Sequence, residues 1–252
     1  MKKALFYGLL LFLVTGCSAG KYQIPKQDYQ AKVQVLGVMP LLVDPALPFE
    51  YPQQEALLDL VKRTATGKHE LLVEQLRSKK GYFDVRPLDG DPALLGLSVL
   101  SGEKSYAVDG RPAGYQFNAE AVAELTRRNV VDGLLVVIIS GAKVKETRRS
   151  RTLLESLTTE YNDIMAMAAV VDRHGEVLWQ LSGADAANIL QLQYADFDEA
   201  FYNKTELVQI KNIGFAGVEK SLQAKGGGLP EVYDKLFGRI VTGISPGLLN
   251  SL

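Results

Sequence analysis

The sequence of 252 residues is poor in cysteine and histidine, which build disulfides and many metal sites. It has one cysteine, Cys17, so a disulfide within the chain is excluded. It has two histidines, and the one at His69 begins the segment HELLV, in which Val73 stands where the zinc-protease pattern HExxH needs its second histidine. We therefore expect no metal and no cofactor.

Strong net charge and long apolar runs are also missing. The formal net charge is −1, which leaves no basic footprint for nucleic acid, so we expect no nucleic-acid partner. After Cys17 no apolar run is long enough to span a membrane. With 47% hydrophobic and 23% charged residues, the chain has the composition of one sizeable globular domain or two small ones.

The start of the chain has the build of an export signal. Lys2 and Lys3 precede an uncharged apolar run over 4–14, which is too short to cross a bilayer. Residues 14–17 read VTGC and resemble the lipobox of bacterial lipoproteins, in which a diacylglyceryl group joins the cysteine thiol and the chain is cleaved before it. We predict a signal peptide over 1–17 and lipidation at Cys17; the alternative is a plain cleaved signal.

Acylation at this position predicts a location. Each buried methylene adds ~0.8 kcal/mol, so two or three acyl chains, such as palmitate, hold a protein on a bilayer without a spanning helix. The residue after the cysteine is Ser18 rather than aspartate. By resemblance to enterobacterial sorting, this favours the outer membrane, with the domain facing the periplasm.

The chain from Ser18 onward alternates between extended and helical patterns. We predict first a polar tether over 18–32, an interior strand over 33–39 and a proline-rich connection over 40–52. One long helix, or two joined at Gly67, then covers 53–80, and an extended segment covers 82–88. A surface excursion with a short helix over 93–116, a helix from Asn118 to about Arg128 and a central strand over 134–140 come next. A hairpin over 161–184, turning at 173–176, and a helix over 205–222 follow.

This order predicts an α/β (α+β) fold, a mixed β-sheet covered by helices. We place the periplasmic domain at 33–223. The segment 224–252 then forms a glycine linker and an added amphipathic helix, whose apolar residues follow i, i+3, i+4 spacing from Leu229 to Val241.

Three short motifs carry a family resemblance. They are the strand end VMPL at 38–41, the turn VDGL at 131–134 and the hairpin VDRHGEVLW at 171–179. They resemble the domain shared by the amino-terminal part of TolB and the curli-secretion lipoprotein CsgG, over most of 33–222. The resemblance implies the same fold and an export apparatus as one possible setting. Long amphipathic hairpins of the kind that a curli pore would use are not visible in the sequence.

Two groups of residues are candidate partner-binding sites: a basic run of Lys143, Lys145, Arg148, Arg149 and Arg151, and a stripe on the terminal helix formed by Tyr233, Leu236, Phe237 and Ile240. The basic run is either a solvated strand extension or loop, or a contact for lipid phosphate or an acidic partner. The stripe is covered either by its own domain, or by a partner or the bilayer. If a partner covers it, deletion of 229–252 leaves the domain folded and weakens an assembly.

Catalytic patterns are weak. Ser245 lies in a G-x-S-x-G segment, but Pro246 interferes with a following helix. Asp196, Asp198 and Glu199 form an acidic group that is most simply a solvated loop. We therefore expect a non-enzymatic assembly or scaffolding module, bound to the bilayer through acylated Cys17 and to an envelope protein or to further copies of itself. The alternatives are a subunit of a CsgG-like export apparatus and an envelope hydrolase.

Overall fold

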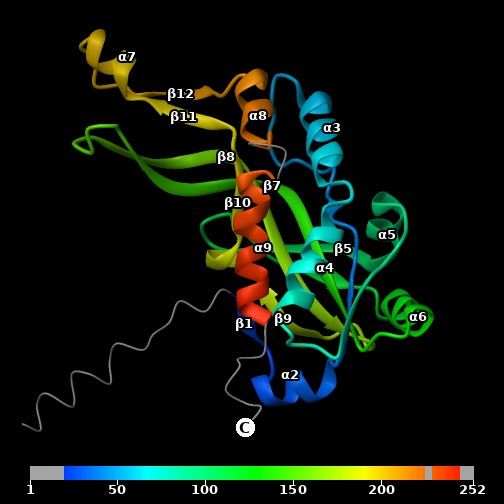
Figure 1. Cartoon of the computed structure of the whole chain (residues 1–252). Helices are drawn as coiled ribbons and strands as arrows, with labels where there is room; N and C mark the ends of the chain where they lie inside the picture. The colour runs from blue at the N-terminus through cyan, green and yellow to red at the C-terminus, as the bar shows by residue number, and fades with distance from the viewer. Residues whose placement is uncertain (1–19, 225–228, 245–252) are drawn as a thin grey trace, which may run out of the picture.

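A mixed sheet of eight strands forms the middle of the molecule, and helices cover both of its faces (Figure 1). The computed structural model describes residues 20–224 and 229–244, so Cys17, the signal segment and Ser245 lie outside the described residues. The strands of the sheet are β1 (Lys21–Tyr22), β2 (Val35–Val38), β3 (Leu42–Val43), β4 (Asp84–Pro87), β7 (Gly133–Arg149), β8 (Ser156–Asp172), β9 (Val177–Leu181) and β10 (Ala187–Gln191). The predicted α/β class is confirmed.

The strands follow the order β1-β9-β8-β7-β2-β4, with β3 paired to β7 and β10 paired to β8. The pairs β2–β4, β2–β7 and β3–β7 are parallel, and the pairs around β8 and β9 are antiparallel. The predicted central strand over 134–140 lies within β7 and is buried on both faces. A run that is apolar at every position suits this place because helices cover both sides of the sheet.

The helices are α2 (Lys26–Lys32), α3 (Gln54–Ala65), α4 (Lys68–Ser78), α5 (Pro92–Val99), α6 (Ala119–Asn129), α7 (Phe197–Tyr202), α8 (Phe215–Ser221) and α9 (Glu231–Ile244), with a 3₁₀ turn, η1, at Gly183–Asp185. Helices α3, α4 and α9 pack on one face of the sheet in the larger core cluster. Helices α5 and α6 pack on the other face together with a hairpin of β5 (Leu100–Tyr106) and β6 (Pro112–Phe117).

Several local predictions are confirmed. Asn118 caps α6, because its side chain accepts hydrogen bonds from the backbone N–H groups of Glu120 and Ala121. The segment over 53–80 forms two helices, which meet at Gly67 with a φ of +71°, a conformation that glycine adopts without strain. The hairpin with its turn at 173–176 is formed by β8 and β9.

The prediction of a tether over 18–32 is wrong for its described part. Strand β1 pairs with β9, and Tyr29 of α2 is fully buried, with its hydroxyl 2.6 Å from that of Tyr82. Two short elements, rather than one sustained pattern, carry the few apolar side chains that tie this segment to the domain.

The excursion over 93–116 and the helix over 205–222 also differ from expectation. The first segment holds α5, as expected, and then the paired strands β5 and β6. The second segment begins with strand β12 (Gln209–Asn212), paired to β11 (Gln193–Asp196), and becomes helical only at α8. Pairing with a distant strand overrides the local helical spacing here.

Helix α9 belongs to the main domain, so the boundary at 224 is wrong. Tyr233, Leu236, Phe237 and Ile240 are fully buried in the larger core cluster, and the Tyr233 hydroxyl lies 3.2 Å from Oγ1 of Thr64. These four residues are therefore core residues rather than partner-binding residues. Deletion of the helix is now expected to unfold the domain, because it would expose that core.

Candidate functional site

Two arms project from the same end of the molecule (Figure 1). The first arm is the outer part of the β7–β8 hairpin, residues 143–162, where the pairing continues from Lys143 opposite Asn162 to Arg149 opposite Ser156. The second arm, residues 193–212, consists of β11, α7 and β12. The two 17-residue strands of the hairpin were not expected from the sequence.

The strand geometry divides the predicted basic run. Side chains alternate between the two faces of a strand, so Lys143, Lys145 and Arg149 share one face of the first arm, where all three are exposed. Arg148 points to the other face, and its side chain is only 12% exposed. The run is thus a strand extension with three solvated cations on one side and one partly buried cation on the other, and Arg151 follows in the turn beyond β7.

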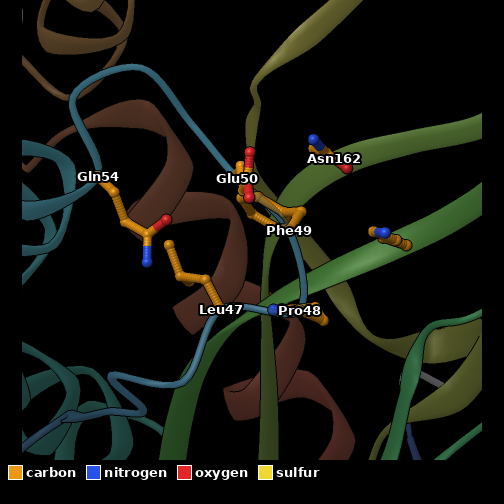
Figure 2. Close-up of a pocket in the computed structure, with 7 residues that line it drawn as sticks. Leu47, Pro48, Phe49, Glu50, Gln54 and Asn162 are labelled. Carbon is orange, nitrogen blue, oxygen red and sulfur yellow. The ribbon is translucent and has the colours of Figure 1, made fainter.

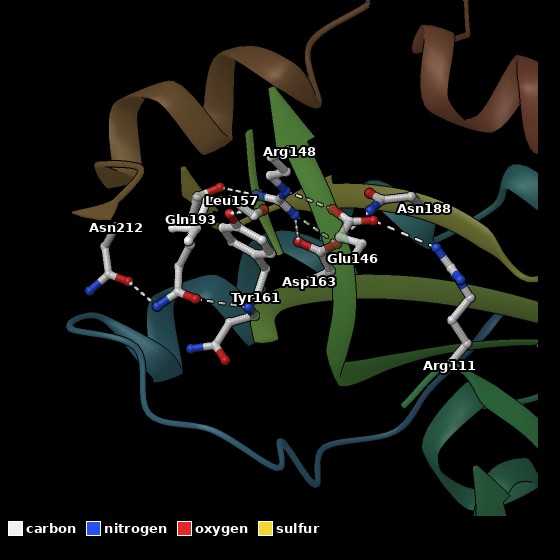
Figure 3. Close-up of polar contacts among 10 residues, drawn as sticks. Arg111, Glu146, Arg148, Leu157, Tyr161, Asp163, Asn188, Gln193 and Asn212 are labelled. Carbon is white, nitrogen blue, oxygen red and sulfur yellow. Dashed lines mark hydrogen bonds and ion pairs between the residues drawn. The ribbon is translucent and has the colours of Figure 1, made fainter. Parts of the chain in front are cut away.

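Arg148 is the centre of a polar network on that second face (Figure 3). Its Nη2 donates to both carboxylate oxygens of Asp163, at 2.9 and 3.1 Å, and its Nε donates to Glu146 at 2.6 Å. The guanidinium carbon lies 3.9 Å from the centre of the Tyr161 ring, within cation–π range. A planar guanidinium with this many partners holds the outer strands in one arrangement.

Asp163 is the buried partner in this network, with an exposed fraction of 0%. The amide of Asn188 on β10 also donates to it, at 2.7 Å. Burial raises the pKa of Asp163 above its ordinary value, while the Arg148 guanidinium acts in the opposite direction. The carboxylate is therefore stable in this position only with its counter-charge in place.

Gln193 connects the two arms (Figure 3). Its side-chain oxygen accepts a hydrogen bond from the backbone N–H of Asn162 at 2.8 Å, and its side-chain amide donates to Asn212 at 3.2 Å. Its backbone carbonyl accepts a hydrogen bond from Nη1 of Arg148. The same guanidinium thus contacts the first strand of the second arm, so the arms are joined near their base.

The β5–β6 hairpin supports the base of the first arm. The backbone N–H of Lys145 donates to the carbonyl of Asp109 at 2.8 Å, and Arg111 lies 3.5 Å from Glu146. A Cβ atom at Gly110 would lie 1.8 Å from the Lys143 carbonyl oxygen. Only glycine permits this close approach of the turn to β7.

The tips of the two arms expose large apolar side chains: Leu153 (67% exposed), Leu154 (88%), Phe201 (73%), Tyr202 (79%) and Leu207 (73%). Arg151 on the first tip forms an ion pair of 2.7 Å with Asp198 on the second, so the tips lie side by side. These residues were not predicted from the sequence, although the pair Leu153-Leu154 within a polar segment is a visible signal.

An open cleft of about 830 Å³ lies where the first arm leaves the core. Figure 2 shows Phe49 and Glu50 of the proline-rich connection on one side of it and Asn162 of β8 nearby. Lys143 lines the same cleft, so the solvated basic face of the arm continues into it.

The acidic group and the histidines are placed separately. Asp196 caps α7 and lies 3.0 Å from Lys211, and Asp198 is paired with Arg151. His174 lies in the turn between β8 and β9, whereas His69 is buried on α4. Among the described residues there is no cluster of histidine, cysteine, aspartate or glutamate suited to a metal ion.

Over residues 20–224 and 229–244, no helix has both the length and the apolar character needed to cross a membrane. The chain matches no protein-family model and no curated protein sequence. Among solved structures, it is similar to a homolog of neuraminyllactose-binding hemagglutinin from Helicobacter pylori. That alignment has 10% sequence identity and a TM-score of 0.33, and it covers 84% of this chain and 83% of the other.

Proposed function

We propose that this chain is a lipid-anchored, non-enzymatic assembly module of the bacterial cell envelope, which binds a partner protein through its two arms. The anchor is Cys17, in a segment with the build of a lipoprotein signal. Ser18 after it favours the outer membrane, with the domain in the periplasm.

The exposed apolar tips carry this proposal. Large apolar side chains gathered in one place on a surface mark interaction sites, and aromatic residues are enriched in the cores of protein interfaces. Phe201 and Tyr202 pack edge to face, with ring centres 5.7 Å apart, and the leucines of the first tip are similarly exposed. The solvent-exposed ion pair of Arg151 and Asp198 links the two tips, and polar groups of this kind are common in the rim of an interface.

The solvated basic face indicates the charge of the partner. Lys143, Lys145 and Arg149 are exposed along one side of the first arm, and Glu160 lies opposite Lys145 in the strand register. A partner with acidic groups beside an apolar patch complements this arrangement. Such charges increase the rate of association and select among partners.

Charge substitution at the tips tests the proposal. The double variant Leu154→Asp/Phe201→Asp keeps every core contact and makes the tips polar. The matched control is Phe83→Asp, because Phe83 is 88% exposed just before β4, at the opposite end of β7 from the arms. Each protein is captured from detergent-solubilised membranes, and co-purifying proteins are identified.

We expect the tip variant to lose its partner at unchanged thermal stability, and the Phe83 control to keep it. The same partner retained at the same yield by all three proteins contradicts the proposal.

An export-apparatus subunit is a second candidate, favoured by the length of the β7–β8 hairpin. The projecting part, however, alternates Lys143, Lys145 and Thr147 on one face with Glu146 and Arg148 on the other, so neither face suits lipid. A ring-shaped oligomer of this chain in detergent extracts would support this candidate. An envelope hydrolase needs converging catalytic groups, whereas Lys211 pairs with both Asp196 and Glu199 on the second arm and His174 lies in the β8–β9 turn.

A further inference from the structure

A cavity of about 440 Å³ lies beside α5 and is lined by residues of β3, α5 and, through Lys62, α3. Ala93, Gly96 and Leu97 of α5 line it at helical spacing, so one side of the helix faces the cavity. Leu42 and Leu100 line it from β3 and β5. Small-molecule sites commonly have volumes of about 300–1,000 Å³ and mainly apolar walls, and this cavity has both properties.

Helix α5 is apolar in almost every position, with the sequence PALLGLSV. A helix that is apolar all round is normally buried, yet Leu94 and Leu97 are 67% and 81% exposed. Leu95 and Val99 pack into the core behind them. The cavity side and the outer side of α5 thus form one continuous apolar surface, which suits an elongated aliphatic ligand rather than a compact polar one.

At the polar end of the cavity, Asp44 and Lys104 form an ion pair with each other. Oδ2 of Asp44 accepts hydrogen bonds from Nζ of Lys104 and from the hydroxyl of Tyr115, both at 2.9 Å. Partial burial lowers the pKa of Lys104, but its hydrogen bond to Asp44 raises that pKa above the ordinary value overall. The negative charge of Asp44 is therefore matched within the protein.

Lys62 of α3 supplies a further positive charge at the cavity wall. Within the described ranges its ammonium group has no ion-pair partner. A smaller cavity of about 200 Å³ shares Lys62 with the first and is also lined by Asp91. The Asp91 side chain already accepts from the backbone N–H groups of Ala93 and Leu94, at 2.9 and 3.0 Å. Because no ion pair among the described residues involves Lys62, its charge is available to an external anion.

We infer that this cavity binds a single-chain anionic amphiphile, with its aliphatic chain along α5 and its anionic head at Lys62. A fatty acid and a lysophospholipid share this chemistry. The inference does not depend on the arms or on the lipid anchor.

Gly96 provides a direct test, because a Cβ atom built on it meets no atom within 4 Å. The variant Gly96→Leu places a side chain in the cavity and raises helix propensity, so folding is preserved. The matched control is Gly238→Leu on α9, which also has open space at Cβ and lies on an exposed position. Binding of dodecanoate to the full chain carrying Cys17→Ser is measured by titration calorimetry below the micelle concentration.

We expect one dodecanoate per chain, at least tenfold weaker binding in Gly96→Leu, and unchanged binding in Gly238→Leu. Lys62→Gln should weaken binding of dodecanoate about tenfold while leaving binding of dodecanol unchanged. Titration of lysophosphatidylglycerol in the same assay tests whether the ligand is a lysophospholipid rather than a fatty acid. Absence of dodecanoate binding, equal binding in Gly96→Leu, or equal affinity for dodecyltrimethylammonium overturns the inference.

Discussion

Replacing Arg148 by methionine tests whether the polar network holds the first arm. The substitution keeps much of the aliphatic stem but leaves the fully buried Asp163 with Asn188 as its remaining side-chain donor. Breaking a buried ion pair by removing one partner costs about 3–5 kcal/mol. For a chain of this size, each kcal/mol shifts Tm by about 2–4 °C, so we expect Tm at pH 7 to fall by roughly 6–20 °C.

The loss should depend on pH. Without Arg148, the folded-state pKa of Asp163 rises further above its unfolded value of about 3.9. A carboxyl group with a raised folded-state pKa keeps its contribution to stability below the unfolded pKa and loses it as pH rises through the folded pKa. The difference in Tm between Arg148→Met and the parent should therefore be smaller near pH 4 than at pH 7.

Scanning calorimetry of the single and double variants provides the measurement. Asp163→Asn in addition to Arg148→Met removes the uncompensated charge and keeps an acceptor for the Asn188 amide, so most of the lost stability should return. A single variant that loses less than about 1 kcal/mol at pH 7, or a double variant no more stable than the single one, refutes the reasoning.

Three further predictions concern the core, the base of the arm and pH. Phe237→Ala should lower the free energy of unfolding by about 3–5 kcal/mol in denaturant titrations, because the side chain is fully buried; a loss below about 1 kcal/mol contradicts its place in the core. Gly110→Ala should speed hydrogen exchange at the Lys145 amide, because the new Cβ pushes the β5–β6 turn away from β7; unchanged protection there argues against that contact. Burial lowers the pKa of His69, so the free energy of unfolding should fall as pH drops below about 6.5, the pKa of the unfolded chain. His69→Gln should weaken this pH dependence in scanning calorimetry. The same pH dependence in the variant and the parent would count against the burial of His69.

The elements best predicted from the sequence are those whose local pattern and surroundings agree. The apolar run at 134–140 can be stable only between two covering layers, and it forms the centre of β7. Asn118 before an amphipathic stretch marks the start of α6 correctly.

The length of the first arm was not predicted, and its basic run was left as either a strand extension or a loop, because its strands have no local apolar pattern. Residues 143–149 read KVKETRR, with one apolar residue among charged and polar ones, which is also the composition of a loop. Their structure comes from pairing with residues 156–162 and from the contact between Arg148 and Asp163, which are 15 positions apart. Sequence spacing does not reveal such a pair.

The terminal helix shows a different limit. The stripe of Tyr233, Leu236, Phe237 and Ile240 was recognised as a surface that must be covered, but an amphipathic pattern does not identify what covers it. The covering surface includes α4 and β10 of the same domain. The short β1 and α2 were missed for a related reason, since two residues of pairing and one buried tyrosine leave little pattern in the sequence.

Photo-crosslinking from the arm tips tests the proposed interaction most directly. A benzophenone side chain is placed at Leu154, at Phe201 or, as the control, at Phe83 in the membrane-anchored protein, and intact cells are irradiated. The two tip positions should yield an adduct with the same envelope protein or with a second copy of this chain, and Phe83 should not. No adduct from either tip, or the same adduct at equal yield from Phe83, would contradict binding through the arms.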